Sequence, residues 1–275
     1  MRAELLDKLD RLKLWASSYD RCAIAYSGGV DSSFLLTALV RAGLSPILAV
    51  SVDPPYVPDW EIAEASAYVS TIKEVEHHIL SYPIPESILD NPEDRCYLCK
   101  RELFNLIKKE AESWGAEILM DGTNADDTGD HRPGMRALRE LKVKSPLLEL
   151  GFTKSEIREI SAEWELPFAD KPAYSCLLTR IPHDTRVTPE ALRRIESAEV
   201  FLHELGFPAV RVRTHGELAR IELAAGDMVR FLSSDTMGQT DRALKGFGYR
   251  FVTCDLGGYS MGNMNSIDKR GGDDE

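Results

Sequence analysis

The stretch Cys22-Ala-Ile-Ala-Tyr-Ser-Gly-Gly-Val-Asp-Ser-Ser-Phe-Leu-Leu-Thr-Ala-Leu-Val40 decides the fold. Its first five residues form an apolar run that predicts a buried strand, and residues 34–40 predict a helix. Between them, Gly28 and Gly29 lack the Cβ atoms that would keep a ligand away from the backbone, and glycine also adopts positive φ. A strand, a glycine turn and a helix start in this order predict a site where backbone N–H groups bind phosphate.

Three polar side chains complete this predicted phosphate cradle. Ser27, Ser32 and the free N–H groups at the helix start would face the bound anion, assisted by the helix dipole. The phosphate loop of ordinary NTPases has a longer spacing and a Lys before its Ser or Thr, whereas Asp31 stands here instead. A carboxylate repels phosphate unless a divalent cation lies between them, so Asp31 predicts a bound Mg²⁺. The alternative is a glycine-rich turn that only connects a strand to a helix.

The hexapeptide 27–32 resembles the PP-loop of the ATP pyrophosphatase superfamily. This resemblance implies that ATP is cleaved between its α and β phosphates and that an acceptor is adenylated.

Hydrophobic patterning predicts a parallel α/β sheet for the first part of the chain. Strand-like runs at 22–26, 46–52, 77–80 and 117–121 alternate with helix-like runs at 33–42, 59–74 and 97–114. Such alternation is typical of a doubly wound parallel sheet. A capping box, Thr153-Lys-Ser-Glu156, predicts a further helix at 153–164.

The pattern changes near residue 170 and predicts a smaller α+β domain. A helix is expected from Thr188-Pro189 to about Leu205. A hairpin at 210–213 and 219–223, a short helix, a helix near 237–245 and a strand at 249–255 then follow. We therefore expect a PP-loop domain at 1–170, a smaller domain at 171–265 and a flexible tail at 266–275.

Bulk composition argues against several classes of function. The 275 residues carry a formal net charge of −12, which argues against a broad nucleic-acid footprint. Residues 1–18 are charged throughout and do not resemble a signal peptide, and no apolar run is long enough to span a bilayer. The sequence therefore predicts a cytoplasmic protein with no membrane contact.

Polar residues that follow the predicted strands are candidates for the nucleotide site. Ligands bind at the carboxyl ends of strands in doubly wound sheets. Asp121, Thr123 and Asn124, in a loop that also holds Asp126, Asp127 and Asp130, are therefore expected at the site, as are Ser51 and Asp53 at its adenosine end. The alternative is that these Asp and Asn residues only form turns.

Three of the five cysteines call for a separate explanation. Cys22 and Cys254 lie in apolar runs and are expected in the core. Cys96 and Cys99 have the spacing of a metal-binding or redox pair, but the redox kind would sit at a helix start after a strand, whereas 91–95 precede this pair. With Cys176 they make three thiols, the number that binds a [4Fe–4S] cluster with one open iron. Two structural cysteines and an unrelated third remain the alternative.

Alternating charges on the predicted hairpin suggest an anion site. Arg211 and Arg213 face one side of their strand, and Arg220 and Glu222 alternate on the partner strand. Paired guanidinium groups can bind phosphate or carboxylate in bidentate fashion. An exposed sheet face with cross-strand ion pairs is the alternative.

Taken together, these segments resemble the LarE family over residues 1–265. The resemblance rests on 27–32, 121–127, 129–134, 171–176, 180–182, 210–216 and 255–259. The family consists of ATP-dependent sulfur transferases that make the nickel-pincer nucleotide cofactor of lactate racemase. It implies adenylation of a carboxylate of pyridinium-3,5-biscarboxylic acid mononucleotide, followed by attack of sulfur and release of AMP.

The resemblance also implies that the smaller domain at 171–265 serves sulfur transfer or substrate binding, and it implies roles for individual residues. Asp31 would bind Mg²⁺, and the pyrophosphate would lie against Ser27, Gly28, Gly29 and Ser32. Cys176 stands at the sulfur-donating position, and the substrate's phosphate or carboxylate would be bound by Arg211 and Arg213, with Arg180 and Glu199 nearby.

Two versions of the sulfur chemistry exist in the family. Either the cysteine gives up its own sulfur and becomes dehydroalanine, or three cysteines bind a [4Fe–4S] cluster that carries a transferable sulfide. Cys96 and Cys99 in addition to Cys176 match the cluster version. The family also implies a homo-oligomer, up to a hexamer. Competing interpretations are tRNA thiolation, amide synthesis of the NAD-synthetase type, and a non-catalytic nucleotide or Fe–S binding protein.

Overall fold

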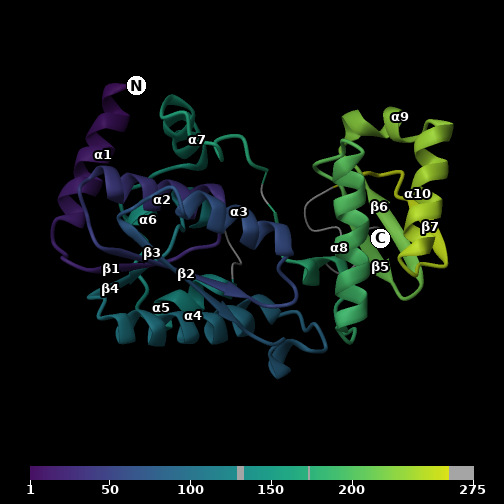
Figure 1. The fold of residues 1–275 in the computed structure, drawn as a ribbon, viewed down its shortest axis with the longest axis horizontal. Coiled ribbons are helices and arrows are strands. Elements are labelled where there is room, and N and C mark those ends of the chain that lie inside the picture. Colours follow the sequence, from purple (N-terminus) through teal and green to yellow (C-terminus); the bar gives the residue numbers. More distant parts are fainter. Residues whose placement is uncertain (129–132, 173, 260–275) are drawn as a thin grey trace, which may run out of the picture. The chain divides into compact units, whose positions relative to one another are not determined.

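The computed structural model describes residues 1–128, 133–172 and 174–259 (Figure 1). They form two compact units, one made of 1–87 and 94–174 and the other of 88–93 and 175–259. The expected domain boundary after residue 170 stays a prediction. The predicted tail at 266–275 and Asp130 lie outside the described residues.

A four-stranded parallel sheet forms the centre of the first unit, as predicted. Its strands are β1 (Cys22–Ala25), β2 (Ile47–Asp53), β3 (Val75–Ser81) and β4 (Ile118–Met120), in the order β3-β2-β1-β4. Every neighbouring pair is parallel. Because the chain winds outward on both sides of β1, a ligand crevice is expected where β1 and β4 end.

Helices cover both faces of this sheet (Figure 1). One layer contains α1 (Ala3–Ala16), α2 (Val30–Arg41), α3 (Asp59–Val69), α6 (Pro146–Glu149) and α7 (Lys154–Glu163), and the other contains α4 (Arg95–Trp114) and α5 (Pro133–Glu140). The helix α2 is buried along most of its length because it packs against β1, α1 and α7. Phe34, Leu35 and Ile24 are fully buried in this core. The turn before α2 is thus held on a rigid base.

The predicted capping box at the start of α7 is confirmed. The Glu156 amide donates to Thr153 Oγ1 over 3.3 Å, and the Thr153 amide donates to Glu156 Oε2 over 2.8 Å. Lys8 Nζ binds both Glu156 oxygens at 2.7 Å. These contacts make Lys154 the first residue of α7.

The second unit is built on the predicted hairpin. The strands β5 (Arg211–His215) and β6 (Leu218–Glu222) are antiparallel, and β7 (Phe251–Cys254) adds to β6 in parallel. The helices α8 (Pro189–Glu204), α9 (Met228–Phe231) and α10 (Ser234–Gly246) accompany this sheet. Leu202, Val212, Ile221 and Leu244 meet in its core. In the described part of the chain, no helix combines the length and apolar character needed to cross a membrane.

Candidate functional site

A cavity of about 440 Å³ lies at the carboxyl ends of the strands in the first unit. Its polar side is lined by Ser27, Gly29, Asp31, Ser32, Asp121 and Thr123. Its apolar side includes Val50 and Val52 of β2 and Phe104 and Ile107 of α4. A polar end built on a helix start and an apolar wall fit the phosphates and the base of a nucleotide.

The two glycines of the turn have different roles. Gly28 has a φ of +69°, and a Cβ atom there would lie 2.6 Å from the Cβ of Ala65 on α3, so its missing side chain admits α3. Gly29 lines the cavity. Its amide donates to Ser27 Oγ over 3.3 Å, and Ser27 Oγ lies 3.2 Å from Ser32 Oγ. The turn is therefore closed by its own hydroxyl groups beside the start of α2.

The two carboxylate oxygens of Asp31 differ in their surroundings. Lys154 Nζ donates to Asp31 Oδ2 over 2.6 Å. The other oxygen, Oδ1, is buried and has no hydrogen-bond partner among the described residues. A buried carboxylate oxygen without a donor fits a divalent cation, and Mg²⁺ commonly takes only one or two protein carboxylates together with phosphates and water. Within residues 1–128, 133–172 and 174–259, no cluster of three or more His, Cys, Asp or Glu suits a metal ion.

Lys154 was missed by the sequence reasoning. Its only sequence signal is the capping box, which places a cation at the first position of α7. A second lysine beside the cradle, Lys171, donates to the carbonyl oxygen of Gly28 over 3.1 Å and pairs with Glu64 at 2.8 Å. Both lysines thus contact residues of the cradle, Lys154 through Asp31 and Lys171 through the Gly28 carbonyl.

The loop after β4 is held by internal hydrogen bonds. Asp121 is buried, and its oxygens accept from Ser145 Oγ at 2.6 Å and from Thr123 Oγ1. The Asn124 amide donates to Asp127 Oδ2 over 3.0 Å, and Asn124 Oδ1 accepts from the amide of Asp126. Asp121 and Thr123 line the cavity, whereas Asn124 does not.

Gly122 brings this loop against the cradle. A Cβ atom at Gly122 would lie 2.7 Å from the backbone nitrogen of Ser32 and 2.9 Å from the carbonyl carbon of Asp31. This requirement was also missed, since a Gly between Asp and Thr reads from sequence as an ordinary turn residue.

Ser51 and Asp53 do not line the cavity. Successive side chains of a strand point to opposite faces, and Val50 and Val52 face the cavity. Ser51 Oγ instead donates to the carbonyl of Tyr26 over 2.7 Å and lies 2.8 Å from His77 Nε2, whose pKa burial lowers. Burial, followed by the charge of Asp59, raises the pKa of Asp53. The expected role of both residues at the adenosine end stays a prediction.

The cysteine pair lies in the first turn of α4. The helix begins at Arg95, two residues before the expected start, and residues 82–94 separate it from β3, so the pair sits near a helix start but does not directly follow a strand. Cys96 is exposed, and Cys99 is half-buried with its Sγ 3.1 Å from Tyr56 Oη. One turn later the same helix face carries Lys100 and Leu103, which line the cavity.

Cys176 belongs to the second unit, where it caps the short 3₁₀ helix η3 (Leu177–Arg180). The proposed cluster of three cysteines stays a prediction, because its members come from both units. The expected core position is confirmed for Cys22, where burial raises the thiol pKa to about 12. Cys254 is only half-buried, at the margin of the second core.

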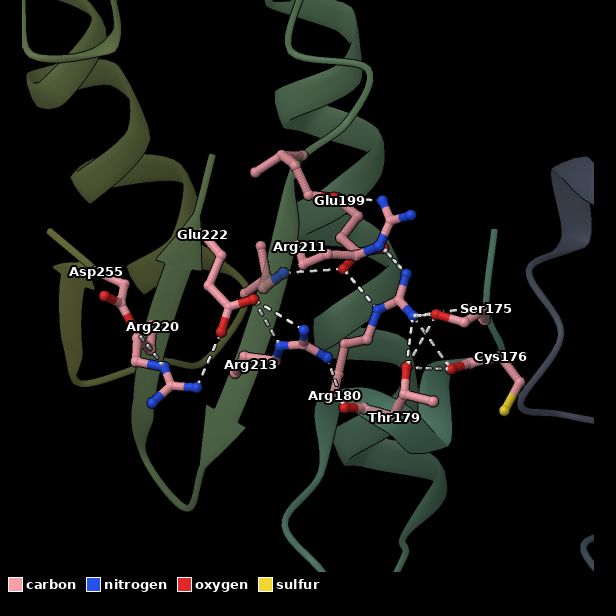
Figure 2. Close-up of polar contacts among 12 residues, drawn as sticks. Ser175, Cys176, Thr179, Arg180, Glu199, Arg211, Arg213, Arg220, Glu222 and Asp255 are labelled. Carbon is pink, nitrogen blue, oxygen red and sulfur yellow. Dashed lines mark hydrogen bonds and ion pairs between the residues drawn. The ribbon is translucent and has the colours of Figure 1, made fainter. Parts of the chain in front are cut away.

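Buried ion pairs link the arginines of the second unit (Figure 2). Arg180 donates from Nε and Nη2 to the two oxygens of Glu199, over 2.9 and 3.0 Å. Arg213 donates from Nε and Nη2 to Glu222 Oε2, over 3.0 and 2.8 Å. Arg220 binds the other oxygen of Glu222 at 2.9 Å. Glu222 is thus held between two guanidinium groups, and Glu199 between the Arg180 guanidinium and the backbone amide of Val212.

The predicted hairpin is confirmed, and a cross-strand ion pair joins Arg213 to Glu222, but the face that carries it is buried and not exposed. Arg211 lies opposite Glu222 and Arg213 opposite Arg220. Arg211 and Arg213 are only 3% and 5% exposed, because α8 and η3 pack against β5.

Burial, followed by the charge of Arg180, lowers the pKa of Arg211, which lies 5.3 Å from the ring centroid of Tyr259. The cluster also includes Asp255, which lies 3.6 Å from Arg220 Nε. These residues comprise four guanidinium groups (Arg180, Arg211, Arg213 and Arg220) and three carboxylates (Glu199, Glu222 and Asp255), so the set has a formal surplus of one positive charge. Such a cluster fits an anionic ligand.

The backbone of Cys176 contacts this cluster, but its sulfur does not point into it. Arg180 Nη1 donates to the carbonyl oxygens of Ser175 and Cys176, over 2.7 and 3.2 Å. Figure 2 shows the sulfur on the far side of Cys176 from the guanidinium of Arg180.

Similar proteins fall into two groups, and no protein-family model matches the chain. The chain is 37% identical to an uncharacterized protein of Synechocystis over 96% of its length and 98% of that protein's. It is 32% identical to the pyridinium-3,5-bisthiocarboxylic acid mononucleotide synthase of Lactiplantibacillus plantarum, over 96% and 95% of the two chains. One of the subunits of the glutamine-hydrolyzing GMP synthase of Methanococcus maripaludis matches 54% of this chain at 30% identity, over 51% of its own length. These relationships support enzyme activity and a sulfur-transfer role.

We expect Gly122→Ala to destabilise the protein by about 1–3 kcal/mol and to weaken nucleotide binding, because the new Cβ must displace the backbone at the start of α2. Urea unfolding and titration with ATP measure the two effects. Gly226→Ala is the control, since a Cβ there meets no atom within 4 Å. Equal behaviour of the two variants would contradict the packing argument.

We expect Glu199→Ala to lower the free energy of unfolding by about 3–5 kcal/mol, because it leaves Arg180 buried without its bidentate partner. Chemical denaturation measures this change. Glu190→Ala on the same helix removes an exposed pair with Arg193 and should stay within about 1 kcal/mol of the parent protein. A loss at Glu199 no larger than that at Glu190 would show that the buried pair is not needed for stability.

Proposed function

Because the chain belongs to the LarE family, we propose that it is an ATP-dependent sulfur transferase that acts on pyridinium-3,5-biscarboxylic acid mononucleotide. A substrate carboxylate oxygen would attack the α phosphorus of ATP, and the bond to the β phosphate would break with release of pyrophosphate. Sulfur would then add to the acyl carbon, and AMP would leave to give a thiocarboxylate. The observation that carries this proposal is a nucleotide-sized cavity on a PP-loop together with a cationic cluster beside Cys176.

The activation half of the reaction is assigned to the cavity of the first unit. Ser27, Gly29 and Ser32 would bind the departing pyrophosphate through hydroxyl and amide groups. Asp31 Oδ1 would hold Mg²⁺, which when bound supplies charge neutralisation between the phosphates and the carboxylate. Lys154 donates to Asp31 Oδ2 and would keep that carboxylate oriented.

The sulfur half is assigned to the second unit. Arg211 and Arg213 would bind the phosphate or free carboxylate of the substrate, and Arg180 with Glu199 would hold the turn and the strand on which they lie. In the sacrificial route, the Cys176 sulfur would add to the acyl carbon as AMP leaves. Loss of the Cα proton and cleavage of the Cβ–S bond would then release the thiocarboxylate and leave dehydroalanine at position 176. In the cluster route, Cys96, Cys99 and Cys176 would hold a [4Fe–4S] group that supplies a transferable sulfide. Two thiols one helical turn apart fit such a group.

Because activation and sulfur transfer are assigned to different residues, we expect Asp31→Asn and Cys176→Ser to have different effects. Asp31→Asn should reduce pyrophosphate release on the order of a hundredfold, because the nucleotide-bound cation loses its ligand. Cys176→Ser should still release pyrophosphate but yield no thiocarboxylate. Phosphate-coupled and mass-spectrometric assays follow the two products, with Cys254→Ser as the control. Unchanged activity of Cys176→Ser, with ammonia as the nucleophile that attacks the adenylate and an amide as the product, would favour a ligase of the NAD-synthetase type.

Iron analysis separates the two sulfur routes. If the cluster forms, anaerobically purified protein should be brown and contain iron and sulfide, and Cys96→Ser, Cys99→Ser or Cys176→Ser should each bleach it. Cys254→Ser should keep the colour. A colourless protein whose Cys176 peptide loses about 34 Da per turnover, the mass of H₂S, would establish the sacrificial route instead.

A further inference from the structure

The segment 88–93 precedes α4 of the first unit but packs within the second. Ile88 is fully buried. The backbone of the segment pairs with the loop before α8, where the Val187 amide donates to the Leu89 carbonyl over 2.7 Å. The Asp184 amide donates to the carbonyl of Asn91 over 3.2 Å. This short piece of chain is therefore an integral part of the second unit.

Asn91 is fully buried, and its side-chain amide serves three backbone carbonyls. Its Nδ2 lies 3.2 Å from the oxygen of Leu178, 2.8 Å from that of Ile181 and 3.0 Å from that of Pro182. Leu178 lies within η3, and Ile181 and Pro182 are the two residues that directly follow η3. The amide therefore binds one carbonyl within the η3 turn and two directly after it.

The backbone of Asn91 explains why this residue type stands here. Its φ is +52°, in the left-handed region that Asn tolerates better than most residues other than Gly. Gly would adopt this conformation but offer no donor, and Asp would place oxygen against three carbonyl oxygens. Asn alone among these three provides both the conformation and the N–H groups.

We propose that Asn91 is a positioning residue for sulfur transfer, which holds the η3 turn and thereby Cys176 and Arg180. The turn is bound from two sides, because Arg180 Nη1 binds the carbonyls of Ser175 and Cys176 at its start while Asn91 binds those at its end. Asn91 acts only through backbone oxygens. This inference rests on the proposed function, in which Cys176 delivers sulfur.

Two variants test it with a matched control. Asn91→Gly keeps the backbone conformation and removes the donors, and Asn91→Asp keeps the shape and reverses the polarity. Asp90→Asn is the control, because Asp90 is the adjacent residue and pairs with Arg186 in an exposed ion pair. At saturating substrate, both Asn91 variants should slow thiocarboxylate formation about tenfold to a hundredfold, since small misplacements of a reacting group have effects of that size. Pyrophosphate release should change less than about twofold, because it depends on the first unit.

Hydrogen exchange of the peptide covering 175–182 gives a readout independent of the reaction. Exchange should rise there in the Asn91 variants while β5 and α8 stay as protected as in the parent and in Asp90→Asn. Unchanged exchange and unchanged sulfur transfer would overturn the inference. Loss of both half-reactions with exchange raised across the whole second unit would overturn it too, as a general structural role. If the parent protein releases pyrophosphate but forms no thiocarboxylate, the proposed function fails, and exchange at 175–182 still decides whether Asn91 supports the turn.

Discussion

The close approach of three backbone segments around the start of α2 is the constraint on which the first unit depends. Because Gly28 has no side chain, α3 can approach the turn, and because Gly122 has none, the loop after β4 can approach the start of α2. Neither position has room for a Cβ atom. The phosphate cradle is therefore shaped by steric contact with two segments far along the chain. A well-packed interior transmits small displacements, so this arrangement fixes the positions of Asp31 and Ser32 without any ligand.

In the second unit, buried ion pairs fix the positions of the side chains, whereas steric contact fixes the cradle in the first unit. Replacing a buried ion pair by apolar residues of similar volume is often neutral or stabilising, so stability alone does not account for Arg180–Glu199 and Arg213–Glu222. Their guanidinium groups are oriented before a ligand arrives, and the cluster carries one more positive charge than negative. Preorganised charge of this kind lowers the reorganisation that binding an anion requires.

Local sequence patterns predicted the fold well, but they did not predict contacts between residues that are far apart in the sequence. Alternation and apolar runs predicted the parallel sheet and the hairpin, and the Thr153-Lys-Ser-Glu156 pattern predicted the capping box, because each depends on neighbours within a few residues. The predicted end of α3 was wrong, because the helix ends at Val69 and not at residue 74. Just after Val69, the side chains of Ser70 and Thr71 donate to the backbone carbonyls of Ala67 and Tyr68, which competes with continuation of the helix. Lys154 and Asp31 are 123 positions apart in the sequence, and no local sequence pattern predicts their contact.

The path of residues 88–93 has a consequence for how such proteins can be rearranged. Neither unit is a continuous piece of chain, so cutting at residue 175 leaves the C-terminal fragment without Ile88 and Asn91. The GMP synthase subunits share only about half of this chain. Grafting the second unit onto another PP-loop protein would therefore require transplanting a six-residue insertion between β3 and α4 along with it. Exchange of modules during evolution faces the same requirement, since both pieces must change together.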